Sequence, residues 1–260
     1  MTTEAAIIGG TGLYDPGLLA GSEAVVVGTP YGTVSLHVGT HAGRSVAFLP
    51  RHGGGHSVPP HRINYRANLW ALRQLGARRV FATAACGTLA QHVPPGALAL
   101  CTDFLDFTRG RATTFFDGQD GRVHHADMTE PYCPALRAVL GAAAVRLGLP
   151  LVPAATYVCT EGPRFETAAE IRAYARLGGD LVGMTGVPEV TLAREAGLCY
   201  ASLAIATNWA AGMAGRPLSH AEVVEAMARS TGQVRRLLLE AIAGLTTTAC
   251  PACPGEPAPV

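Results

Sequence analysis

The feature that most constrains the fold is a repeated succession of short apolar segments, small-residue turns and amphipathic segments. Apolar runs such as residues 5–10 (AAIIGG) are typical of buried strands, whereas residues 64–77 carry apolar side chains at helical spacing. Such alternation predicts an α/β fold with a mixed, largely parallel central sheet flanked by helices. Further strands are expected at 24–39 (as a hairpin), 45–50, 78–89, 96–107 and 199–208, and residues 180–198 are expected to form a strand, a glycine turn and a helix. Further helices are expected at 133–149, 166–179 and 219–245, the last with Ser219 as its N-cap.

The chain shows no internal repeat and no break in composition, so we expect one domain over residues 1–246. Residues 247–260 (TTACPACPGEPAPV) are rich in proline and cysteine, and we expect a flexible tail there. Cys250 and Cys253 form a single CxxC pair in this tail. One pair supplies half of a zinc site and no second pair is evident in the sequence, so the CxxC is interpreted as incidental and no metal is predicted.

Charge and cysteine usage exclude several partner classes. Charged residues make up 15% of the chain and the net charge is +1, which argues against nucleic acid or an anionic membrane as a partner. No apolar run is long enough to span a membrane, and the start of the chain lacks a basic signal-peptide region. Seven scattered cysteines, an odd number, favour reduced thiols and a cytoplasmic location.

Two motifs at strand ends have the chemistry of anion binding. Residues 9–12 (GGTG) follow the first strand, where backbone N–H groups and the Thr11 hydroxyl can approach an anion. A nicotinamide-dinucleotide loop is the rival interpretation, but GxGxxG is not completed because Asp15 stands at the third position. Arg51 and His52 follow the strand at 45–50, and we expect both to donate to a phosphate; His56 and His61 are given surface or structural roles.

Three other segments add donors and apolar contacts. Residues 82–89 (ATAACGTL) are interpreted as a small-residue turn, residues 159–171 carry Phe165 and Glu166, and residues 183–190 carry Met184 and Thr185. A first-turn helical acid is the alternative role for Glu166. The apolar strand at 199–208 ends on an amide, Asn208. Strand ends of this kind converge in α/β proteins, so together these motifs predict one cavity for an anion beside a flat polar heterocycle.

The chain carries, in this order, the motifs IIGGTGL, RHG, NYRANLWAL, ACGTL, EGPRFETAAEI, GMTGVPEV and LAREAGLCYASLAI. In their residues and their order, these motifs resemble the trimeric methylthioadenosine phosphorylase and purine nucleoside phosphorylase family over about residues 5–245. The resemblance implies phosphorolysis of a purine nucleoside to free base and pentose 1-phosphate, with inorganic phosphate as co-substrate and no cofactor. It also implies a homo-oligomer, either a trimer or a dimer of trimers, with active sites near subunit interfaces. Residues 124–134 (HHADMTEPYCP) resemble a segment that reaches a neighbouring site.

The resemblance also assigns roles to individual positions. Catalytic roles fall on Asn208, Glu166 and His52. Positions that match the family's phosphate site are Thr11, Arg51, His52, Ala84, Ala85 and Thr185. Positions that match contacts to sugar and base are Phe165, Glu166, Met184, Asn208, Trp209, Ala210 and His220.

Hydrogen-bond chemistry points to an oxygen at C6 of the purine. An Asn208 amide can donate to O6 or N7, and an ionised Glu166 can accept from N1–H. Adenine would set its N1 lone pair against Glu166, at a cost of about 1–3 kcal/mol. His220 resembles a residue that meets a 5′-hydroxyl, which favours inosine and guanosine; it can equally be an exposed helix residue. 5′-Methylthioinosine and, less favoured, 5′-methylthioadenosine are the alternatives.

Three rival classes stay open from the sequence. A water-using nucleosidase would keep the base site without needing the donors around Arg51. A non-catalytic purine-binding module would tolerate their loss. A dehydrogenase would bind a nicotinamide dinucleotide through residues 9–12.

Overall fold

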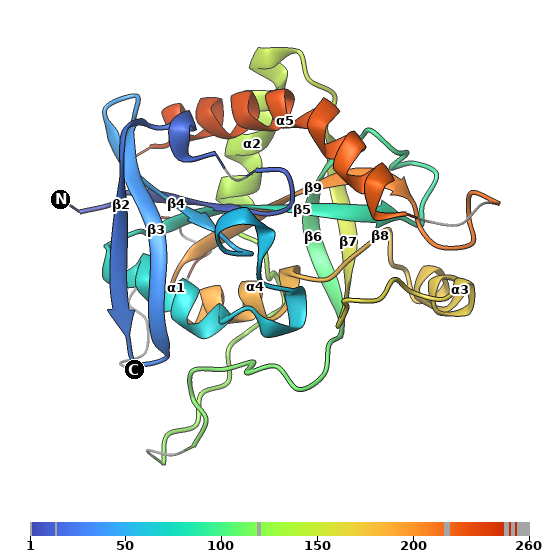
Figure 1. The fold of residues 1–260 in the computed structure, drawn as a ribbon, viewed down its shortest axis with the longest axis horizontal. Coiled ribbons are helices and arrows are strands. Elements are labelled where there is room, and N and C mark those ends of the chain that lie inside the picture. The colour runs from blue at the N-terminus through green and yellow to red at the C-terminus, as the bar shows by residue number, and fades with distance from the viewer. Residues whose placement is uncertain are drawn as a thin grey trace.

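A mixed nine-stranded sheet, counted over the described residues, forms the centre of the protein, and helices cover both of its faces (Figure 1). The computed structural model describes residues 2–13, 15–118, 121–215 and 219–246, together with Cys250 and Cys253, but not the side chain of His220. The strands are β1 (Ala5–Gly9), β2 (Ala20–Thr29), β3 (Gly32–His41), β4 (Arg44–Pro50), β5 (Arg79–Thr88), β6 (Leu98–Phe107), β7 (Val152–Thr160), β8 (Leu181–Gly183) and β9 (Cys199–Trp209). The helices are α1 (Tyr65–Gln74), α2 (Pro134–Leu147), α3 (Ala168–Arg176), α4 (Gly186–Glu195) and α5 (His220–Ala243), with short 3₁₀ turns at Pro16–Leu18, Gly54–His56 and Pro60–Arg62.

The strand order is β2-β3-β4-β1-β5-β8-β7-β6-β9, and β9 pairs back onto β5. Five of these pairings are parallel and four are antiparallel. The predicted α/β class and mixed sheet are confirmed, but the sheet is not largely parallel. The reason is local for β2 and β3, because a two-residue connection can join only antiparallel neighbours. For β9 the reason is the strand order, because β9 pairs with two strands and runs parallel to β5 but antiparallel to β6.

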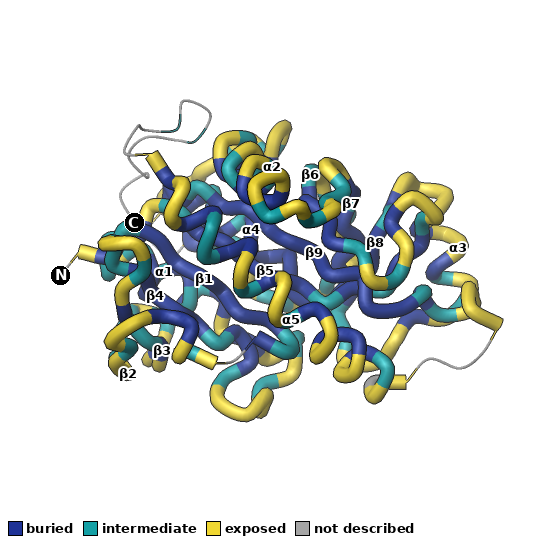
Figure 2. Tube along the Cα trace, turned by 90° about the horizontal axis from the view of Figure 1, so that it is seen from above, coloured by how far each residue is buried: buried dark blue, intermediate teal, exposed yellow. Residues whose placement is uncertain are grey.

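The continuous apolar run of β1 reflects burial on both faces of the sheet. Ala5 and Ile7 face one apolar cluster that includes α2 and α5, whereas Ala6 and Ile8 face a second cluster that includes α1 and α4. Alternate side chains of a strand point to opposite faces, so a strand covered on both sides needs apolar residues throughout. Figure 2 shows the buried central strands beneath helices whose outer surfaces are exposed.

Helix boundaries follow the capping residues. The hydroxyl of Ser219 accepts from the N–H of Glu222 at 3.3 Å, which confirms Ser219 as the N-cap of α5. Helix α3 begins later than predicted, because Thr167 and Glu170 form a capping box at its start. Glu166 therefore precedes the helix, and the first-turn acid is Glu170.

Four parallel strands bring their carboxyl ends to one edge of the sheet. β1 is parallel to β4 and β5, and β5 is parallel to β9. Near that edge the β5–β9 register shifts, since Cys86 pairs with Ala206 and Gly87 with Asn208. Thr207 is thus an extra residue in β9, and such a bulge changes the direction of the side chains that follow.

No helix in the described part of the chain is both long and apolar enough to cross a membrane. The predicted tail, residues 247–260, lies outside the described residues apart from Cys250 and Cys253.

Candidate active site

A cavity of about 440 Å³ lies where these strand ends meet. Its walls come from segments far apart in the sequence: the turn after β1, the segment after β4, the end of β5, the loop after β7, the residues after β8, the end of β9 and the first turn of α5. The lining residues include Thr11, Arg51, His52, Ala84, Ala85, Phe165, Glu166, Met184, Thr185, Asn208 and Ala210, all predicted as site residues. The predicted convergence of these motifs on one cavity is confirmed.

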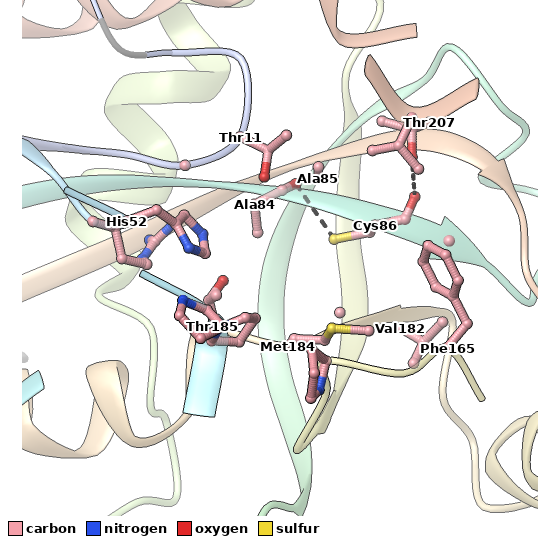
Figure 3. Close-up of a pocket in the computed structure, with 18 of the residues that line it drawn as sticks. Thr11, His52, Ala84, Ala85, Cys86, Phe165, Val182, Met184, Thr185 and Thr207 are labelled. Atoms are coloured by element: carbon pink, nitrogen blue, oxygen red, sulfur yellow. Dashed lines mark hydrogen bonds between the residues drawn. The ribbon is translucent and has the colours of Figure 1, made fainter. Parts of the chain in front are cut away.

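One end of the cavity is polar. In Figure 3, the hydroxyl groups of Thr11 and Thr185 point into the space between them, with the His52 ring beside it. Phe165 and Met184 lie toward the other end. A site with hydroxyl donors at one end and apolar side chains at the other suits a ligand that is anionic at one end and flat at the other.

Arg51 is held rigidly under the polar end. Its Nε and Nη2 donate to the carboxylate of Glu189 at 2.6 and 2.7 Å, and its Nη1 donates to the carbonyl of Thr83 at 2.8 Å. Burial alone would lower the pKa of Arg51, but the Glu189 carboxylate outweighs it and raises the pKa above its usual value. A guanidinium has five N–H groups, so two remain for a ligand after these three bonds.

His52 is neutral and its tautomer is fixed. Burial, and then the charge of Arg51, lower its pKa to about 4. Its Nδ1 lies 2.9 Å from the carbonyl of Val58, and since a carbonyl only accepts, Nδ1 carries the proton. Neutral His52 therefore presents the Nε2 lone pair, an acceptor, where the sequence led us to expect a donor.

The turn after β1 requires glycine. A Cβ on Gly10 would lie 2.7 Å from the carbonyl oxygen of Thr83 and 2.8 Å from Nη1 of Arg51. Gly12 has φ +81°, and its Cβ would lie 2.8 Å from Cβ of Met227 in α5. Larger residues would displace the loop that carries Thr11, so the glycines bring this hydroxyl and the backbone close to the Arg51 guanidinium.

The Asn208 amide is oriented by its neighbours. Its Nδ2 donates to the carbonyl of Trp209 at 2.8 Å, and its Oδ1 lies 2.6 Å from the hydroxyl of Thr207. A carbonyl accepts only, so the amide cannot be turned around without losing that bond. One N–H of Nδ2 has no partner among the described residues and remains for a ligand.

Glu166 is also buried and oriented. Its Oε1 accepts from the hydroxyl of Thr160 at 2.7 Å. Burial raises its pKa above the ordinary value, and the hydrogen bond from Thr160 opposes that rise. Its Oε2 has no side-chain hydrogen-bond partner among the described residues and can accept from a ligand N–H.

A phosphorylase-superfamily family model matches residues 4–243. The chain belongs to the phosphorylase superfamily. It is 54% identical over 243 residues to a 6-oxopurine nucleoside phosphorylase from Pyrococcus furiosus, covering 91% of each chain. It is 52% identical over 224 residues to a probable S-methyl-5′-thioinosine phosphorylase from Methanopyrus kandleri, covering 86% of this chain and 85% of that protein. Methylthioadenosine phosphorylase from Schistosoma mansoni, solved with adenine, superimposes with a TM-score of 0.89 at 37% identity, over 93% of this chain and 91% of that one.

Some predicted positions of this phosphorylase-superfamily chain differ from expectation. Ala84 and Ala85 lie within β5, because the strand continues to Thr88 rather than turning. Trp209 does not line the cavity; its carbonyl positions Asn208 instead. His220 begins α5, and its side chain lies outside the described part of the chain.

The fold also reveals residues that the sequence did not single out. Glu189 orients Arg51 from α4, Thr207 orients Asn208, and Val223 lines the cavity from α5. His56, expected to be structural or at the surface, lines the cavity and packs against His52 with ring centroids 4.4 Å apart. Glu189 itself carried the available sequence signal, because it is the only charged residue in GVPEVTLA and a buried charge is unusual.

Proposed function

We propose that this enzyme catalyses the reversible phosphorolysis of 6-oxopurine nucleosides, inosine and guanosine, to the free base and ribose 1-phosphate. The observation that carries the proposal is the oriented Asn208 amide, which keeps one N–H for an acceptor on the base. Hypoxanthine and guanine offer O6 and N7 as acceptors and N1–H as a donor to Glu166. Relatives more than 50% identical carry the name 6-oxopurine nucleoside phosphorylase, which supports the same substrate class.

The mechanism follows from where charge develops. Phosphate binds at the polar end, through the two remaining N–H groups of Arg51 and the hydroxyls of Thr11 and Thr185. The monohydrogen phosphate dianion keeps one O–H, and the Nε2 lone pair of neutral His52 accepts it. Phosphate attacks the anomeric carbon as the glycosidic bond breaks, and its charge stabilises the cationic sugar.

The base leaves with the bonding electrons. Asn208 donates to N7 or O6 and Glu166 accepts from N1–H, so both stabilise the purine as negative charge builds on it. No side-chain nucleophile is needed in this scheme, and we propose that phosphate is the co-substrate and that no cofactor takes part. Positioning and fixed donors supply the catalysis.

A second candidate is the phosphorolysis of S-methyl-5′-thioinosine. Val223 lines the cavity from the first turn of α5, next to the His220 position, and an apolar side chain there can contact a methylthio group. The Methanopyrus kandleri relative carries this activity in its name. Both candidates use the same 6-oxopurine site and differ only at the 5′ position.

We further propose that the chain works as a homo-oligomer, a trimer or a dimer of trimers, in the cytoplasm. The segment between β6 and α2 extends away from the body of the molecule (Figure 1), and Val123 in it is 78% exposed. Residues 124–134, from this segment to the first residue of α2, resemble a stretch that reaches a neighbouring site, which supports contact between subunits. Sedimentation at several protein concentrations tests the assembly.

A substrate panel tests the proposed function. Base release from inosine, guanosine, adenosine, 5′-methylthioadenosine and 5′-methylthioinosine is measured with and without phosphate. We expect phosphate-dependent cleavage of the 6-oxopurine nucleosides, and cleavage without phosphate would indicate a nucleosidase. Cleavage of methylthioinosine alone would select the second candidate, and preference for adenine nucleosides would overturn the assignment of Asn208.

Glu166→Gln tests the partner of N1. A glutamine can donate to adenine N1, so we expect the ratio of kcat/KM for inosine over adenosine to fall by about tenfold or more. Glu170→Gln is the matched control, since Glu170 lies four residues on and bonds Arg164 and the start of α3 rather than lining the cavity. The control should keep the wild-type ratio.

A further inference from the structure

Four cysteines from three parts of the chain meet at one point far from the cavity. Their sulfur atoms, from Cys133, Cys199, Cys250 and Cys253, all lie within 4.8 Å of one another. Cys133 is the N-cap of α2 and Cys199 is the first residue of β9. The sequence shows only one CxxC pair, and the fold supplies the two missing sulfurs.

The spacing of the sulfurs matches a bound ion rather than bonded cysteines. A zinc–thiolate bond is about 2.3 Å, so a tetrahedron of four sulfurs has edges of about 3.8 Å. Cys133 and Cys250 have sulfurs 3.5 Å apart, close to that edge and well beyond the roughly 2.05 Å of a disulfide. All seven cysteines are free thiols in this structure.

We propose that these four cysteines bind one structural zinc ion. Zinc replaces four thiol protons, giving a tetrathiolate complex of charge −2 and four released protons. Four protein ligands fill the tetrahedron and leave no position open for substrate, which makes the site structural rather than catalytic. Soft thiolates select zinc over magnesium or calcium, whose preferred ligands are oxygens.

The surroundings of the cluster fit this role. Its cysteines pack against the apolar cluster that includes α2 and α5, so water has limited access. Cys133 stands at the positive end of the α2 dipole, which favours negative charge on its sulfur. The backbone N–H of Cys133 donates to the carbonyl of Tyr200 at 2.8 Å, and Arg79 donates to the carbonyl of Thr246 at 2.9 Å. The first bond joins the start of α2 to the start of β9, and the second joins the chain after α5 to Arg79 of β5, which pairs with Cys199.

The ion would connect the segment after α5 to the start of β9. Asn208 lies nine residues along the same strand, about 30 Å away at the usual rise per residue. We therefore expect zinc to stabilise the C-terminal part of the fold with little effect on the chemistry. This inference does not depend on the proposed function, because metal content is measured without any substrate.

The test begins with the full-length protein, prepared with reductant and zinc and then freed of unbound metal. Inductively coupled plasma emission spectrometry should measure about one zinc ion per chain. A thiol reagent should find the four cluster thiols protected until a chelator releases the metal. Cobalt substitution should give the absorption of a tetrahedral tetrathiolate. The double variant Cys250→Ser/Cys253→Ser should hold at least about tenfold less zinc, whereas Cys101→Ala, which removes a buried thiol outside the cluster, should keep it.

Three results would overturn the proposal. Zinc content near zero in wild-type protein, with the four cluster thiols reacting before any chelator is added, would leave only a thiol cluster. Disulfides would be shown if protein made without reductant failed to bind zinc and had an intact mass lower than that of the reduced chain by the hydrogens of one or two disulfide bonds. Stoichiometric iron at the same sulfurs would show that zinc is the wrong metal. Both variants should keep the wild-type circular dichroism spectrum, so that a loss of zinc is not explained by unfolding.

Discussion

Glu189 accepts two hydrogen bonds from Arg51, at 2.6 Å from Nε and 2.7 Å from Nη2, and both side chains are almost completely buried. The hydroxyl of Tyr200 also donates to Glu189 at 2.6 Å. A buried carboxylate with these bonds fixes the plane of the guanidinium and directs its two remaining N–H groups. Because the guanidinium is already oriented before an anion binds, less free energy is spent on reorganising the site when the anion binds.

Glu189→Gln should weaken phosphate binding more than nucleoside binding. The variant loses the negative charge that balances the buried guanidinium of Arg51, and one of the carboxylate oxygens that hold its plane. The guanidinium is therefore less well positioned. We expect KM for phosphate to rise by about tenfold or more while KM for inosine changes less. Initial rates over a grid of both substrates measure the two constants.

A control separates this effect from a general loss of charge. Glu225→Gln removes an exposed ion pair with Arg229 on α5, and exposed pairs contribute about 0–1 kcal/mol. Its kinetics should match the wild type. Equal rises of both KM values in Glu189→Gln would argue against a positioning role for Glu189.

Asn208→Asp should reverse the preference for the base. A carboxylate accepts only, so it loses the donor to O6 or N7 and sets an oxygen against the Trp209 carbonyl. We expect kcat/KM for inosine to fall by about a hundredfold, and the ratio of adenosine to inosine to rise.

Asn64→Asp is the matched control for that substitution. Asn64 caps α1 through its Oδ1 and donates its amide N–H to the carbonyl of Tyr31, outside the cavity. Aspartate is an equally good N-cap, so the substrate ratio should not change. An unchanged ratio in Asn208→Asp as well would remove Asn208 from the base site.

His52 should make the protein less stable in mild acid. Its folded pKa of about 4 lies below the unfolded value of 6.5, so the unfolded chain binds the proton more strongly. Neutral His52 makes its full contribution to the free energy of unfolding above pH 6.5. As the pH falls toward 4, that contribution is lost and the free energy of unfolding decreases by about 3 kcal/mol. Urea unfolding of wild type and His52→Asn at a series of pH values should show this difference.

An asparagine amide can still donate to the Val58 carbonyl, but it does not titrate in this pH range. Parallel curves for wild type and His52→Asn would show that His52 is not the titrating group.

Gly12→Ala should destabilise the fold and disturb the phosphate end. The new Cβ meets Met227 at 2.8 Å and the backbone has φ +81°, so we expect a loss of about 2–4 kcal/mol of unfolding free energy and a higher KM for phosphate. Gly21→Ala carries a similar φ of +59° with open space around it, and should cost only about 1–2 kcal/mol. Similar losses in both variants would exclude the contact with α5 as a cause.

Local sequence was sufficient for most of the elements and for most of the cavity. β1 and β9 are apolar runs bounded by small residues, and the N-cap at Ser219 is read directly from the chain. Strand ends in an α/β fold converge, so Thr11, Arg51 and Asn208 could be expected in one cavity before their contacts were known.

Pairing across the sequence was not available from local signals. The direction of β9 against β6 depends on which strand it meets, and nothing in its own residues specifies that partner. The same holds for Glu189, which lies 138 residues from Arg51, and for His52, whose tautomer is set by the Val58 carbonyl.

The sequence by itself determined the α/β class, most of the elements and the small, polar and apolar residues that line the cavity, because these depend on periodicity and on residue type. Strand β7 was not among the strands expected from the sequence. Only the tertiary structure decided which nitrogen of His52 carries its proton, how Asn208 is oriented and which groups hold Arg51 in place. It also brought Cys133 and Cys199 to the CxxC pair. The physical reason is that hydrogen bonds and sulfur clusters depend on distances between atoms remote in the chain, which folding alone fixes.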